Sequence, residues 1–133
     1  MMHPGTAANQ YLRTQVRSSA PLELVVLLYD AALRFTAAAR EAMVRGDIKA
    51  RRTAISKAMA VINELQISLD LDKGGVVAEE LDRLYIWINS SLVDAVAKQD
   101  VRLIDDARRV LEILHDGWKG IAASPPAAAG AAR

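Results

Sequence analysis

The chain has 133 residues, 52% of them hydrophobic, which is enough for one domain with its own core and too few for two. Its 17 basic and 16 acidic residues are spread along the chain and leave a net charge of +1, so we expect no nucleic acid and no membrane surface as partner. There is no cysteine for a disulfide or a thiolate metal site, and no run approaches the roughly 18 apolar residues of a membrane span. With no signal-peptide pattern at its start, we expect a cytoplasmic protein without membrane insertion.

Helix-start and helix-stop signals divide the chain into four segments. Pro21 suits the opening turn of a first helix, and Gly46 supplies a left-handed stop for it. Asp47 can cap a second helix, which we expect "DKGG" to end, and Asp100 opens a short break before the last helix. The predicted helices span residues of about 21–45, 48–72, 76–98 and 102–123.

Apolar residues recur at helical spacing in these segments, and no alternating run supports a strand. The predicted core stripes of the last three helices are Ile55, Met59, Ile62, Leu65 and Leu69; Val77, Leu81, Leu84, Ile88, Leu92 and Ala95, with Tyr85 and Val96 beside them; and Ile104, Ala107, Leu111, Leu114, Trp118 and Ile121. Short connections between long helices favour antiparallel neighbours. We therefore predict an all-α fold, an antiparallel up-down four-helix bundle over residues 18–123, with an N-terminal arm at 1–17 and a disordered tail at 124–133.

Some apolar residues of the third predicted helix fall outside its core stripe. Ile86 and Val93 are seven residues apart and share a second face, and Trp87 lies beside them in sequence. One interpretation is that protein surfaces are ordinarily more than half apolar. The other is that these residues, next to small polar ones, line a shallow groove for another helix.

The sequence offers little for catalysis or metal binding. His3 lies near the start of the chain, and His115 has no second histidine or cysteine at ligand spacing. The doublets Glu79-Glu80 and Asp105-Asp106 fall in first turns of predicted helices, where negative charge favours the helix dipole. We predict no enzyme activity, no catalytic or metal-binding residues and no cofactor.

One alternative assigns a role to His115. The stretch "HDGWKG" in a helical bundle resembles histidine phosphotransfer domains, in which a lysine and a glycine follow the histidine by three and four positions. Here Lys119 and Gly120 follow His115 by four and five, so the spacing does not match. The other interpretation of His115 is a polar residue near a helix end, where a cation is favourable.

A series of segments in order along the chain resembles the flagellin export chaperones, the FliS family. The segments are "QYLRTQV", "APLELVVLLYDAALRF", "GDI", "LDLDKGG", "LDRLYIWI" and a last helix with Trp118. The resemblance implies a chaperone that binds the disordered C-terminal region of flagellin, prevents premature polymerisation in the cytoplasm and assists delivery to a component of the flagellar export gate. Weak self-association stays open.

From the leftover apolar residues and the resemblance together we expect a set of partner contacts. It comprises Tyr11, Leu12, Ile55, Met59, Ile62, Leu65, Ile86 and Val93. Tyr11 and Leu12 belong to the arm, which the resemblance implies to be a mobile cap that gives way to flagellin. We expect Leu28 and Tyr85 to be core residues instead, because an inward tyrosine contributes a large buried area.

Overall fold

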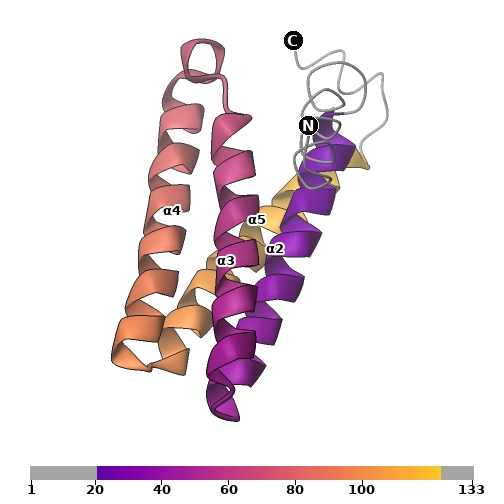
Figure 1. Ribbon diagram of the computed structural model, residues 1–133. Coiled ribbons are helices and arrows are strands. Elements are labelled where there is room, and N and C mark those ends of the chain that lie inside the picture. Colours follow the sequence, from indigo (N-terminus) through magenta and orange to yellow (C-terminus); the bar gives the residue numbers. More distant parts are fainter. Residues whose placement is uncertain (1–20, 124–133) are drawn as a thin grey trace, which may run out of the picture.

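The computed structural model describes residues 21–123, which form four helices in an up-down bundle (Figure 1). They are α2 (Pro21–Val44), α3 (Ile48–Ile67), α4 (Leu71–Lys98) and α5 (Val101–Ala122). Each helix packs on its neighbour in sequence, and α5 closes the ring against α2. The predicted fold class is confirmed. The arm and the tail lie outside the described residues.

Aspartate caps begin three of the helices. The carboxylate Oδ1 atoms of Asp47, Asp70 and Asp100 each accept a hydrogen bond, 3.0 Å long, from a backbone N–H in the first turn of α3, α4 and α5. Such caps satisfy amides that have no partner within the helix. Between α2 and α3, Gly46 has φ +75°, a left-handed conformation that glycine adopts without strain. The short connections therefore hold neighbouring helices antiparallel.

The α3–α4 connection differs from the sequence prediction. We expected α3 to continue to residue 72 and "DKGG" to end it, but α3 ends at Ile67 and α4 begins at Leu71, with Asp70 as its cap. The glycines lie inside the start of α4, where Gly75 makes a kink at φ 56° and ψ −133°. An added Cβ on Gly74 would lie 2.5 Å from the Cβ of Ala78, so this bend requires glycine there. The glycine pair bends a helix start and does not end a helix.

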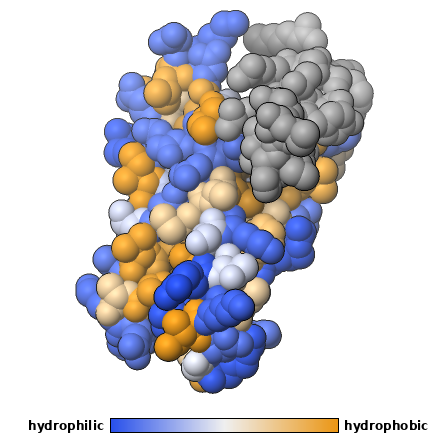
Figure 2. Space-filling view, in the orientation of Figure 1, coloured by the Kyte–Doolittle hydropathy of each residue, from blue (hydrophilic) through white to orange (hydrophobic). Residues whose placement is uncertain are grey.

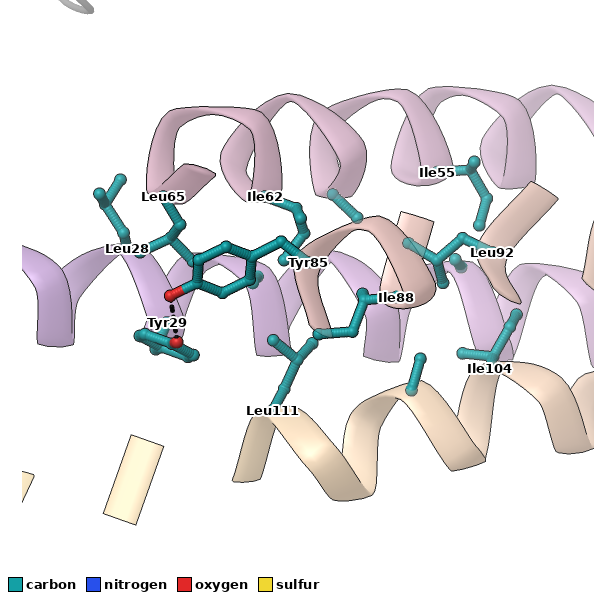
Figure 3. Close-up of a cluster of buried hydrophobic side chains, with 14 of the residues drawn as sticks. Leu28, Tyr29, Ile55, Ile62, Leu65, Tyr85, Ile88, Leu92, Ile104 and Leu111 are labelled. Atoms are coloured by element: carbon teal, nitrogen blue, oxygen red, sulfur yellow. Dashed lines mark hydrogen bonds between the residues drawn. The ribbon is translucent and has the colours of Figure 1, made fainter. Parts of the chain in front are cut away.

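The core is a single cluster of side chains, to which all four helices contribute. Its large and completely enclosed members are Tyr29, Tyr85, Ile62, Leu65, Ile88, Leu92, Ile104 and Leu111 (Figure 3). Alanines of α2 and α3, among them Ala32, Ala39, Ala54 and Ala58, are also buried. Small residues at such positions let two helix backbones approach closely.

Most residues of the predicted core stripes are buried or pack partly buried against the core, and three do not. Val77 is 68% exposed and Ile121 is 51% exposed, because both lie near helix ends where fewer neighbours cover them. In α4 the inward position belongs to Tyr85, which is 1% exposed, while Leu84 is only half-buried. The prediction that Leu28 and Tyr85 are core residues is confirmed.

Polar contacts inside the bundle fix how the helices pair. The hydroxyl oxygens of Tyr29 on α2 and Tyr85 on α4 lie 2.6 Å apart (Figure 3). Burial raises the pKa of both tyrosines, so both stay neutral. The guanidinium of Arg40 donates two hydrogen bonds to Asp105, which joins α2 to α5.

A double-mutant cycle tests the tyrosine pair. We expect Tyr29→Phe to lower the free energy of unfolding by about 1–3 kcal/mol, because it leaves the buried Tyr85 hydroxyl without its partner. Tyr85→Phe should cost a similar amount, since it leaves the buried Tyr29 hydroxyl without its partner. The double variant should be less destabilised than the sum of the single ones. Urea denaturation followed by circular dichroism measures all three, and additive effects would show that the hydroxyls act independently.

Candidate functional site

A shallow depression lies on the outer surface where α3 meets α4. It encloses about 360 Å³ and is lined by Met59, Gln66, Ile86, Asn89, Ser90, Val93 and Asp94. Ile86 and Val93 are each 51% exposed, a large fraction for such apolar side chains. Figure 2 shows apolar residues along the side of the molecule where α4 lies, interrupted by polar ones. We call this feature the α3–α4 depression.

The helical repeat of α4 explains why these residues lie outside. Residues buried in the bundle follow one another at three- and four-residue steps, from Leu81 through Tyr85 and Ile88 to Leu92. Ile86 and Val93 are two turns apart and lie on a neighbouring stripe. The hypothesis that they are exposed rather than core residues is therefore confirmed.

Side-chain hydrogen bonds cross from α3 to α4 beside the depression. The amide Nδ2 of Asn89 donates to Oδ1 of Asn63 at 3.0 Å, and Nε2 of Gln66 donates to Oδ1 of Asp82 at 2.8 Å. These contacts fix the relative position of the two helices at the surface. A partner would therefore find apolar side chains on a preformed support.

A larger cavity opens at the end of the bundle where α3 turns into α4. It has a volume of about 830 Å³, and its apolar lining includes Leu22, Val25, Leu28, Leu65, Ile67, Leu69, Leu71, Val77, Leu81 and Trp118. We call it the end cavity. The sequence alone does not predict this cavity, because Val77 and Trp118 follow the helical spacing of core residues. The kink at Gly75 and the exposure of the residues that follow it depend on where α4 begins, which the sequence pattern does not show.

The structure separates the predicted partner contacts into three groups. Met59, Ile86 and Val93 meet in the α3–α4 depression. Ile55, Ile62 and Leu65 are at most 8% exposed and belong to the core, with Leu65 also lining the end cavity. Tyr11 and Leu12 lie outside the described residues. Trp87, which is 42% exposed, is not among the residues that line the depression.

His115 belongs to α5, and its side chain packs against α2. Its side chain is only 12% exposed, its Nε2 lies 2.7 Å from Oδ1 of Asp30, and its ring stacks on Tyr29 with centroids 6.4 Å apart. A phosphate donor needs access to an imidazole nitrogen, which this packing restricts. The geometry therefore disfavours phosphotransfer at His115.

Within residues 21–123, no group of three or more His, Cys, Asp or Glu side chains could hold a metal ion. Over the same residues, no helix is both long enough and apolar enough to cross a membrane.

Comparison with known proteins gives a consistent result. Residues 4–125 match the family model described as Flagellar protein FliS. The chain is similar to the flagellar secretion chaperone FliSB of Pseudomonas aeruginosa, at 36% identity over 90% of this chain and 98% of that protein. It is also similar to the flagellar secretion chaperones FliS of Salmonella typhimurium, at 32% over 83% and 82% of the two chains, and of Campylobacter jejuni, at 31% over 90% and 94%.

Polar substitutions test the separation of depression from core. We expect Ile86→Gln and Val93→Gln to change the free energy of unfolding by no more than about 0.5 kcal/mol, because both side chains are half exposed. Ile88→Gln, at a position with no exposure, should cost about 3–5 kcal/mol through lost packing and a buried amide. Thermal and urea denaturation measure the difference. Collapse of the Ile86→Gln variant would place that residue in the core.

Proposed function

The chain belongs to the flagellar protein FliS family, whose members are flagellar secretion chaperones and not enzymes, and from this premise we propose that it binds the disordered C-terminal region of flagellin. Binding takes place in the cytoplasm, prevents premature polymerisation and precedes delivery to the flagellar export gate. The observation that carries this proposal is the exposure of Ile86 and Val93 beside Met59 in one depression.

Physical chemistry favours a helical client segment at this position. An amphipathic helix can place its apolar face on the exposed side chains of α3 and α4, and this covers the surfaces through which client molecules would otherwise assemble. The client must lose conformational freedom to do so, which keeps its affinity moderate and its release possible. No chemical step is required.

The contact proposal gives the predicted residues different roles. Met59, Ile86 and Val93 touch the client, since they are the members that reach the surface of the depression. Ile55 and Ile62 support that surface from inside the core and reach a client only if the bundle opens. Leu65 is available only through the end cavity.

The arm completes the proposed cycle. We propose that residues 7–17, with Tyr11 and Leu12 on one side, cover the apolar depression when no client is present. A short helix is marginal in water and needs such a surface. The client then has to displace the arm, so its apparent affinity falls by the fraction of molecules in the open state.

Titration with a synthetic flagellin C-terminal peptide tests client binding. We expect a one-to-one complex, a helical signal above the sum of the components and a negative heat-capacity change from apolar burial. Ile86→Gln should weaken binding about tenfold, as expected for a central contact, whereas Ile113→Gln on α5, 70% exposed in the parent, should not. Binding should change little between low and moderate salt, since its contacts are apolar. Tight binding with an unchanged summed spectrum would contradict the proposal.

Removal of the arm tests its role. A variant without residues 1–17 should bind the same peptide more tightly, because no displacement is needed, and Tyr11→Ala should give part of this gain. Isothermal titration calorimetry compares these variants with the full chain. Weaker binding by the truncated protein would mean that the arm contributes contacts to the complex.

A further inference from the structure

The two ends of the bundle carry opposite charge. Residues 40–57, around the α2–α3 turn, contain six basic and two acidic side chains, whereas residues 64–83, around the α3–α4 turn, contain six acidic and two basic ones. These turns lie at opposite ends of the bundle (Figure 1). A net charge of +1 conceals this polarity, because the two ends cancel.

The acidic end is hollow and apolar inside. Three carboxylates, of Glu64, Asp70 and Asp72, lie among the residues that line the end cavity, and none of the described lining residues is a lysine or an arginine. Ile67 and Val77 also line it, and they are 55% and 68% exposed. A complementary partner would present apolar side chains flanked by cations.

The basic end has that composition. Val44 and Ile48 flank the α2–α3 turn and are 67% and 57% exposed, and Lys49 and Arg52 follow on the first turns of α3. The turn projects from the end of the bundle (Figure 1). Its shape is fixed by the positive φ of Gly46 and by the helix cap that follows. We call residues 44–52 the basic turn.

We propose that the basic turn of one copy docks in the end cavity of a second copy. Val44 and Ile48 enter the apolar cavity, and the cations beside them meet the carboxylates of Asp70 and Asp72. Because different surfaces of the two copies meet, the contact is heterologous and leaves one free end of each kind. Short head-to-tail chains result. At each contact the apolar side chains of the basic turn and the apolar lining of the end cavity are covered.

This association is weak and depends on salt. Exposed ion pairs contribute little to affinity, and Arg45 is already 3.6 Å from Asp47 within its own chain. The charges therefore orient and select the partner, while burial of the apolar side chains provides most of the affinity. The contact uses neither Ile86 nor Val93, so it is independent of the proposed client site.

Sedimentation velocity of the full chain tests the proposal. The weight-average sedimentation coefficient should rise with protein concentration up to about 1 mM in 50 mM salt, and this rise should be smaller in 0.5 M salt, where the charges are screened and the apolar contact remains. Val44→Gln/Ile48→Gln should weaken association at least tenfold. The matched pair Leu27→Gln/Ile113→Gln, which changes side chains that are 57% and 70% exposed elsewhere, should leave it unchanged.

Charge variants show whether the contact joins different surfaces. Lys49→Glu/Arg52→Glu reverses two positive charges of the basic turn. Asp70→Asn/Asp72→Lys removes the negative charges of these two residues from the end cavity, and asparagine at position 70 can still cap the helix. Each variant alone should be monomeric, and an equimolar mixture should form dimers and nothing larger, since only one intact junction remains. Association that survives either variant overturns the proposal. So does a monomeric full chain that associates only after residues 1–17 are deleted, because the arm would then occupy the cavity.

Discussion

A four-helix bundle can bury only one stripe of each helix, and this limit determines which apolar residues of the chain remain available to a partner. In α4 the stripe is used by Leu81, Tyr85, Ile88 and Leu92, all inside the core. Ile86 and Val93 have no place in it and stay half exposed on the adjacent face. The surface proposed for the client is thus a direct consequence of how completely the core is filled.

The packing that fills the core also keeps this surface fixed. The buried Tyr29–Tyr85 hydroxyl contact ties α2 to α4, and Arg40 ties α2 to α5 through Asp105. On the outside, the Asn63–Asn89 contact joins α3 to α4 beside the depression. Because this support is preformed, the client loses most of the conformational freedom that binding removes. The free energy gained from apolar burial is therefore opposed mainly by the client's loss of entropy.

Sequence reasoning predicted the bundle well because its signals are local. Proline at a helix start, glycine in a left-handed stop and aspartate caps act through neighbouring backbone groups, and the helical repeat reports which face is buried. It was wrong at "DKGG", where a glycine pair is as compatible with a kinked helix start as with a helix end, and only the cap at Asp70 decides between them. It assigned Ile86 and Val93 to the surface but could not find the end cavity, since Val77 keeps core spacing at a position that neighbouring helices leave uncovered.

The central claim is that the client covers the α3–α4 depression without disturbing the core, and methyl NMR of the isoleucines and methionines tests it most directly. Saturation with the flagellin C-terminal peptide should shift the methyl signals of Ile86 and Met59, which line the depression, and leave that of Ile104, which is completely buried in the core, nearly unchanged. Large shifts at Ile113 on α5 with none at Ile86 would contradict this account, because the client would then lie on a different face of the bundle.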